Sequence, residues 1–186
     1  ERQPIENLTE TRRIVAALQG LGAKVAIDDV GTGHSGLSYM LKLGVDMIKP
    51  DFGEQVEPYA LAADGAQGDA LHNVYALLYN RCVYEAASRY AKGGAFLFSR
   101  AAWAGSQRYP AQWGGDPQAD WGGLAASIRG GLSWGLTGAP FYATDVGGFY
   151  GDQRDPLLYV RWAQASVFSA HMRLHGIGAR EPWSYG

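Results

Sequence analysis

Hydrophobic residues along this chain occur either in short continuous runs or at intervals of three to four positions. Short apolar runs ending near acidic residues occupy residues 24–29, 45–51 and 139–145, and a similar run at 94–100 ends in an arginine. Residues 68–92 instead show the longer spacing. Continuous runs are typical of strands buried on both faces of a parallel sheet, and the wider spacing is typical of amphipathic helices. The pattern therefore predicts strands that alternate with helices.

This alternation predicts the α/β class, with a parallel β/α (TIM-like) barrel as the architecture. Strands are expected near residues 5–10, 24–29, 45–51, 94–100, 110–114 and 139–145, and helices near residues 14–21, 37–43, 68–92, 124–134 and 156–172. A complete eight-stranded barrel typically needs about 250 residues, whereas this chain has 186. We therefore expect a single barrel-like domain over residues 1–186, incomplete with about six strands. The unpaired edges of such a barrel favour a homodimer.

Composition narrows the function classes. A net charge of −2 gives no electrostatic basis for binding nucleic acid or an anionic membrane. The single cysteine, Cys82, excludes an internal disulfide, and its place on the apolar face of the long helix predicts a small core residue. Neither a signal peptide nor an apolar run near 18 residues is found, so we expect a cytoplasmic protein.

The strongest candidate chemistry lies in Lys49-Pro-Asp-Phe-Gly-Glu54, where a predicted strand delivers Asp51 to a loop. Functional residues of α/β folds lie just beyond the carboxyl ends of such strands. A second acid, Asp116, follows two glycines, and Arg100 ends another predicted strand. Glycoside hydrolysis requires two carboxyl groups on opposite sides of the scissile bond. Asp51 and Asp116 are therefore candidates for this pair, with Arg100 as a ligand-binding or ion-pairing residue.

Several motifs between about residue 48 and residue 186 resemble glycoside hydrolase family 31, in particular its α-xylosidase branch. They are Lys49-Pro-Asp-Phe-Gly-Glu54 (family motif KTDFGE), Phe98-Ser-Arg100, Trp113-Gly-Gly-Asp116 (WGGD), Asp145-Val-Gly-Gly-Phe149 and Arg173-Leu-His-Gly176. The resemblance implies a retaining α-glycosidase that acts on α-xylosides or α-glucosides without a cofactor. It assigns the nucleophile to Asp51 and the acid/base to Asp116. Substrate-binding roles are implied for Arg100, Trp113, Asp145, Lys49 and Phe52, with Trp113 as a stacking face for a sugar.

Residues 1 to about 50 resemble a different family, the EAL domain of cyclic di-GMP phosphodiesterases. The DDFGTG signature of that family is matched by Asp28-Asp-Val-Gly-Thr-Gly33, and Leu8-Thr-Glu10 resembles its ELTE strand. This resemblance implies a Mg or Mn site at Glu10, Asp28 and Asp29. The chain would then be a chimera of two barrel fragments. A metal-dependent cyclic di-GMP phosphodiesterase or binder, and a catalytically silent chimera, are the alternatives to the glycosidase.

Two weaker patterns carry other interpretations. Gly31, Gly33 and Gly36 satisfy the G-x-G-x-x-G dinucleotide fingerprint, but the acids before them would repel a pyrophosphate. His171 and His175 are spaced as zinc ligands on one helical turn, although no glutamate follows in the metalloprotease manner. We therefore favour the EAL-like signature over a dinucleotide site for the glycines, and a structural or supporting role over zinc binding for the histidines.

Overall fold

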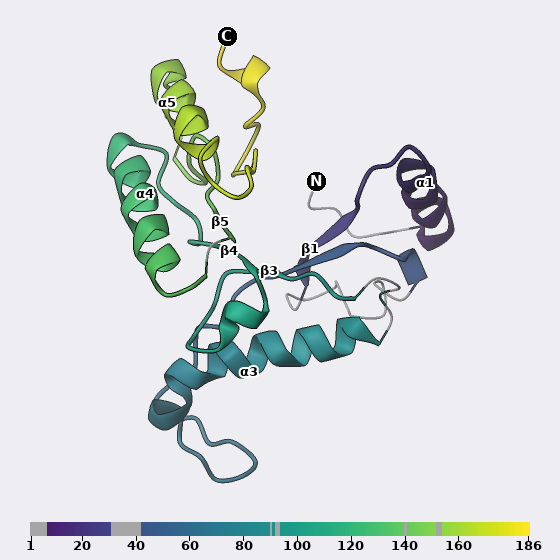
Figure 1. The fold of residues 1–186 in the computed structure, drawn as a ribbon, viewed down its shortest axis with the longest axis vertical. Helices are drawn as coiled ribbons and strands as arrows, with labels where there is room; N and C mark the ends of the chain where they lie inside the picture. The colour runs from purple at the N-terminus through teal and green to yellow at the C-terminus, as the bar shows by residue number, and fades with distance from the viewer. Residues whose placement is uncertain (1–6, 31–41, 90, 92–93, 140, 152–153) are drawn as a thin grey trace. The chain divides into compact units, whose positions relative to one another are not determined.

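A computed structural model describes residues 7–30, 42–89, 91, 94–139, 141–151 and 154–186. The chain divides into two compact units, residues 1–109 and residues 110–186. Each unit is an α/β arrangement in which short parallel strands are covered by helices (Figure 1). None of the described helices is long and apolar enough to cross a membrane.

The first unit is built on parallel strands β1 (Ala26–Val30) and β2 (Met47–Pro50). Ile48, in the middle of β2, also pairs in parallel with Leu97, just before β3 (Phe98–Ser99). β2 is thus central, which explains why its sequence is continuously apolar up to Lys49. Helix α3 (Gly68–Ser88) packs Val83 and Ala87 onto Ile48 and forms the core of this unit.

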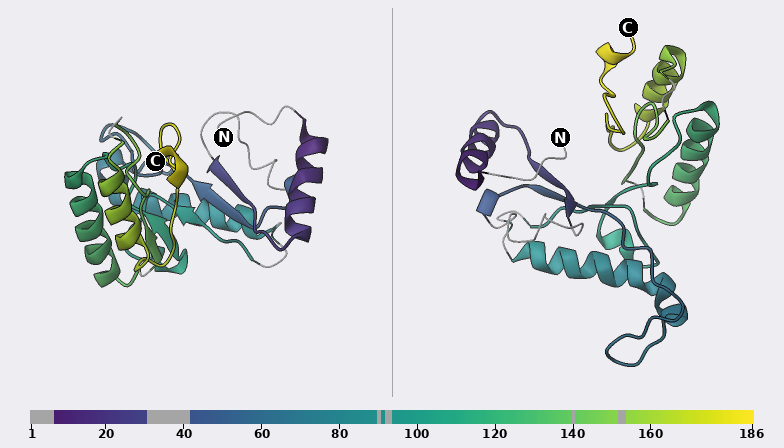
Figure 2. Two further views of the ribbon diagram at one scale, coloured as in Figure 1. Left: turned by 90° about the horizontal axis from the view of Figure 1, so that it is seen from above. Right: turned by 180° about the vertical axis from the view of Figure 1, so that it is seen from behind.

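The second unit repeats this construction with parallel strands β4 (Ala111–Trp113) and β5 (Phe141–Ala143). Helices α4 (Trp121–Leu136) and α5 (Pro156–Ser166) lie side by side next to them (Figures 1 and 2). Their shared core consists of Leu124, Val146, Leu158, Tyr159 and Trp162. Asp120 and Asp155 start the two helices by accepting hydrogen bonds from backbone N–H groups of the first turn. The described strands of neither unit close into a barrel by themselves.

Five of the six predicted strands correspond to β1–β5, but the first is wrong. Residues 8–10 begin helix α1 (Leu8–Gly20), because the Asn7 side chain accepts a hydrogen bond from the Glu10 backbone N–H and caps the first turn. The rest of that strand, the helix expected at 37–43 up to residue 41, and the glycine fingerprint lie outside the described residues.

Two further helix predictions need correction. The last helix ends at Ser166 instead of continuing to residue 172, so His171 and His175 share no helical face, and the zinc alternative that the sequence analysis disfavoured has no helical basis. Cys82 is exposed, not buried in the core. The apolar stripe of α3 is broad in sequence, but the residues it buries are Ala76, Asn80, Val83 and Ala87. Cys82 lies beside that stripe.

Candidate active site

Asp51 directly follows β2, at the end of the central strand of the first unit, as the sequence predicts. Its carboxylate is about nine-tenths buried, with a side-chain exposure of 10%. The Phe52 backbone N–H donates a hydrogen bond to Asp51 Oδ1 over 2.8 Å. The strand end and this hydrogen bond fix the carboxylate, of which a small part remains exposed.

The Asp51 carboxylate lies between two cations. Arg100 Nη1 is 3.0 Å from Asp51 Oδ1, and Lys49 Nζ is 3.4 Å from Asp51 Oδ2. Each cation also contacts a second acid: Arg100 Nη2 lies 2.7 Å from Glu54, and Lys49 Nζ lies 2.7 Å from Asp28. Three carboxylates and two cations therefore form one continuous network. The two ion pairs of Asp51 are largely buried and weakly screened by solvent, whereas Asp28 and Glu54 are 47% and 42% exposed, so their pairs are screened more strongly.

The residue after Asp51 adopts an unusual backbone conformation. Phe52 has a φ angle of 59°, the only positive value found among the described residues other than glycine. The ring is about half exposed, and the Arg100 guanidinium lies 4.3 Å from its centroid. Strained backbone that the surroundings hold in place is concentrated at functional sites. Phe52 and Arg100 together present an aromatic and a cationic surface next to the carboxylate.

In the second unit, Asp116 follows β4 after the glycine pair Gly114-Gly115 and is half-buried. A side chain at Gly114 would overlap the Tyr142 hydroxyl, and Gly115 has a φ angle of 86°. Both positions therefore favour glycine, which lets the loop turn tightly away from the strand. Asp51 and Asp116 belong to different units, so their expected convergence stays a prediction.

Trp113 does not offer the stacking face that the sequence predicts. The residue is 1% exposed, and the Arg173 guanidinium lies 5.5 Å from the centroid of its ring system. Trp113 is the last residue of the short strand β4 and belongs to the buried part of the second unit. At this burial its ring has no exposed face on which a sugar could stack.

Asp145 is also inaccessible, with 0% of its surface exposed. Arg173 Nη1 lies 3.2 Å from its carboxylate, and the two residues also pair as neighbouring strands. Burial, with a smaller contribution from the positive charge of Arg173, lowers the pKa of nearby His171. Direct contact between Asp145 and a substrate, as the motif implies, would require this pair to open.

The described residues do not form the metal site expected from the EAL-like motif. Glu10 is on α1 and forms an exposed ion pair with Arg13, whereas Asp28 pairs with Lys49. The side chain of Asp29 lies outside the described residues. Within the part of the chain that the structure describes, no cluster of three or more His, Cys, Asp or Glu residues could hold a metal ion.

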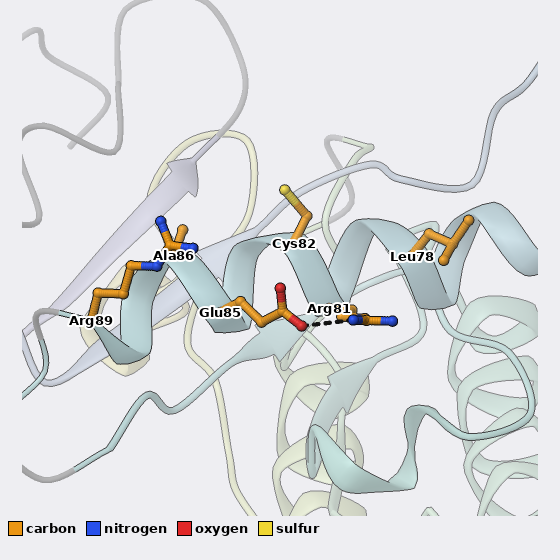
Figure 3. A pocket seen from close by; sticks show the side chains of 6 residues that line it. All are labelled: Leu78, Arg81, Cys82, Glu85, Ala86 and Arg89. Atoms are coloured by element: carbon orange, nitrogen blue, oxygen red, sulfur yellow. Dashed lines mark hydrogen bonds and ion pairs between the residues drawn. The ribbon is translucent and has the colours of Figure 1, made fainter. Parts of the chain in front are cut away.

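A shallow hollow on α3 is formed by Leu78, Arg81, Cys82, Glu85, Ala86 and Arg89 (Figure 3). Its lining comes from one helix, and the ion pair between Arg81 and Glu85 spans it at 2.7 Å. None of the candidate site residues lines it. The hollow is therefore separate from the Asp51 network.

Three contributors were missed by the sequence analysis. Glu54 was quoted only as part of a motif, yet it is the second acid bound by Arg100. Tyr79 donates a hydrogen bond to the Asp51 backbone carbonyl over 2.8 Å. Arg173 is the partner of Asp145. Glu54 could have been identified from its position three residues after Asp51. Nothing in the local sequence distinguished Tyr79 from the other tyrosines of α3.

These observations define an α/β domain that presents a largely buried, ion-paired carboxylate at the end of a central parallel strand. The profile of the glycosyl hydrolases family 31 TIM-barrel domain matches residues 34–186. The chain therefore belongs to that family. This result also extends the glycosidase region towards the N-terminus, because the motifs predicted its start at about residue 48. Residues 34–50 fall within the match, which does not support an EAL-like origin for them.

Individual relatives agree with this family. An alpha-xylosidase from Emericella nidulans is 45% identical over 159 residues, which cover 83% of this chain and 20% of that protein. A cycloalternan-degrading enzyme from Trueperella pyogenes has the same fold, with a TM-score of 0.82 at 21% identity over 94% of this chain and 33% of that one. The structure of the glucosidase II alpha subunit with bound Glc1Man2 matches with a TM-score of 0.68 and 34% identity. The match covers 75% of this chain and 17% of that one. The chain thus spans about a fifth of the length of the xylosidase.

Proposed function

We propose that this chain carries the catalytic region of a retaining α-glycosidase that acts on α-xylosides or α-glucosides. Asp51 is the nucleophile and Asp116 the acid/base in this proposal. The observation that carries it is the Asp51 carboxylate, nearly buried at the end of β2 and contacted by Arg100 and Lys49. Membership of family 31 and the high identity to an alpha-xylosidase support the substrate class.

The reaction follows from the chemistry of two carboxyl groups. A carboxylate oxygen of Asp51 attacks the anomeric carbon while the carboxylic acid of Asp116 protonates the departing glycosidic oxygen. Water then attacks the glycosyl ester as Asp116 removes its proton, and the Asp51 carboxylate leaves with retention of configuration. Such a mechanism needs the two carboxyl groups about 5–5.5 Å apart. It uses no metal or other cofactor.

The residues around Asp51 suit a neutral glycoside. The half-exposed Phe52 ring offers an apolar surface to a sugar, and Arg100 and Lys49 hold the nucleophile by their ion pairs. Asp145 and Trp113 are buried, and both contact Arg173, so in this proposal they support the second unit without touching the sugar. We also propose a cytoplasmic location and a homodimer formed through strand edges, for which the sequence is the only support.

Hydrolysis of aryl α-xylosides and aryl α-glucosides tests the proposal. The purified protein should release the sugar with the α configuration, measured by NMR before mutarotation, and EDTA should leave the rate unchanged. Asp116→Ala should lower kcat for an unactivated disaccharide by about 10²- to 10⁴-fold, while aryl substrates with good leaving groups lose much less. Absence of any α-glycoside hydrolysis would overturn the proposal. Loss of activity in EDTA would instead point to metal-dependent chemistry.

A further inference from the structure

Helix α3 contacts the backbone of the proposed nucleophile. The Tyr79 hydroxyl donates a hydrogen bond to the carbonyl oxygen of Asp51 over 2.8 Å, and the tyrosine is half-buried. The two residues are 28 positions apart in sequence. This hydrogen bond therefore ties a long helix of the core to the turn at which Asp51 leaves β2.

The ring of Tyr79 also occupies the space next to Gly53. A Cβ atom on Gly53 would overlap the Cδ1 and Cε1 atoms of that ring, and Gly53 has a φ angle of 87°. Only glycine fits both the conformation and the contact. Tyr79 thus supports the turn on two sides, through its hydroxyl at Asp51 and its ring at Gly53. The strained backbone of Phe52 lies between these two points.

The next residue of the helix supports the opposite side of the same ion pair. Asn80 is completely buried, and its side-chain amide donates to the carbonyl oxygen of Ala101 over 2.7 Å. Ala101 directly follows Arg100, which contacts the Asp51 carboxylate at 3.0 Å. Consecutive residues of α3 therefore bind the backbone at, or immediately after, both partners of this ion pair.

We propose that Tyr79 and Asn80, together called the α3 brace, are positioning residues that fix Asp51 relative to Arg100. This inference rests on the proposed function, since it assigns the brace to the nucleophile of that reaction. Neither side chain contacts substrate in this role. Catalytic groups must be held close to the reactive geometry, and a displacement of about 1 Å can cost on the order of 10²-fold in rate. The brace holds the turn at the place where such a displacement would begin.

The first test compares Tyr79→Phe with the control Tyr75→Phe. Tyr75 lies one turn earlier on α3, and its ring is 6.3 Å from that of Tyr79, so both variants lose one hydroxyl from the same helix. Tyr79→Phe should lower kcat about five-fold or more with little change in KM, because the hydrogen bond to Asp51 is lost. Tyr75→Phe should match the parent. Equal kcat values in the parent and both variants would overturn the proposal.

A second readout does not depend on activity. The Phe52 amide donates to the Asp51 carboxylate over 2.8 Å, so its hydrogen exchange reports on the turn. Exchange at Phe52 should be several-fold faster in Tyr79→Phe than in Tyr75→Phe. If the parent hydrolyses no α-glycoside but this difference is observed, the proposed function fails and the brace stands as a support of the turn. If the parent is active and exchange is unchanged, only the brace fails.

A matched pair of glycine variants tests the ring contact. Gly53 and Gly65 both have a φ angle of 87°, but a Cβ on Gly65 would meet no atom within 4 Å. Gly53→Ala and Gly65→Ala therefore introduce similar backbone strain, and only Gly53→Ala also collides with Tyr79. Gly53→Ala should lower kcat at least ten-fold more than Gly65→Ala does. Similar losses in the two variants would show that the ring contact has no positioning role.

Discussion

Asp51 and Asp145 are both carboxylates that follow a parallel strand and pair with an arginine, but their surroundings differ. Asp51 retains some exposure and shares two cations with Glu54 and Asp28. Asp145 is fully buried and is held by Arg173 at 3.2 Å. The same position after a strand thus produces two kinds of site. The motif position alone does not tell a reacting carboxylate from a supporting one.

The two carboxylates also differ in how much stability the protein should lose when each one is removed. Lys49 and Arg100 each keep another acid if Asp51 is removed, so the network can remain neutralised. A buried arginine that loses its carboxylate is much more costly, because a charge without a partner cannot be solvated in the interior. We therefore expect Asp51 to be important for activity and Asp145 for stability.

The largest effect is expected from Asp51→Asn. The amide has nearly the same size but is a very poor nucleophile, so kcat should fall by about 10⁴-fold or more. The free energy of unfolding should change by no more than about 1 kcal/mol, measured by denaturant titration. A variant that unfolds more easily by several kcal/mol would place Asp51 in the same category as Asp145.

The smaller variant Asp51→Ala provides a chemical control. Azide can enter the space left by the carboxylate and attack the anomeric carbon from the same side. The product should be a glycosyl azide of inverted configuration, detected by NMR. Formation of this product requires that residue 51 faces the anomeric carbon, whereas its absence together with full residual hydrolysis would exclude Asp51 as nucleophile.

Asp145→Asn should mainly lower stability. Removing one partner of a buried ion pair typically costs about 3–5 kcal/mol, because the other charge stays buried. The measurement is again the free energy of unfolding, and Asp155→Asn serves as a control because asparagine also caps a helix well. If Asp145→Asn is as stable as this control, the pair with Arg173 is dispensable and the contrast with Asp51 breaks down.

Much of the fold could be predicted because most elements carry a periodic apolar pattern. β2 is short, but Met47 and Ile48 before Lys49 are apolar, and Ile48 is buried against Val83 and Ala87 of α3. The first predicted strand failed because residues 5–10 are mostly polar and carry little strand signal, whereas Asn7 caps the first turn of a helix. The final helix was overextended because apolar residues continue beyond Ser166, where the backbone hydrogen bonds change to the three-residue spacing of turns at Phe168 and Ser169.

The site was predicted where a residue stands at the end of a predicted strand, and it was missed where a contact depends on tertiary packing. Asp51, Lys49 and Arg100 were identified, and the structure brings them together. Tyr79 could not be found because its contact with Asp51 depends on how α3 packs against β2. Trp113 was misjudged for a related reason: aromatic residues suit sugar stacking only when exposed, and exposure is decided by tertiary packing.

A more moderate effect is expected from Arg100→Lys. Arg100 contacts Asp51 and Glu54 through two different nitrogens, which a single ammonium group cannot reproduce. Catalytic efficiency, kcat/KM, should fall about ten-fold, with the larger part in kcat if the arginine orients the nucleophile. Arg81→Lys is a suitable control, because its exposed pair with Glu85 lies elsewhere on α3. Equal kcat/KM in Arg100→Lys and the control would remove Arg100 from the site.

The smallest effect concerns the pH dependence of the Asp145 region. Burial, and then the charge of Arg173, lowers the pKa of His171 in the folded protein below its ordinary value of 6.5. The unfolded chain therefore binds more protons than the folded one as the pH falls below about 6.5, and the folded state loses stability over that range. His171→Gln should show a shallower loss in unfolding free energy between pH 7 and pH 5 than the parent. Identical slopes for the parent and His171→Gln would mean that burial and the Arg173 charge do not lower the pKa of His171.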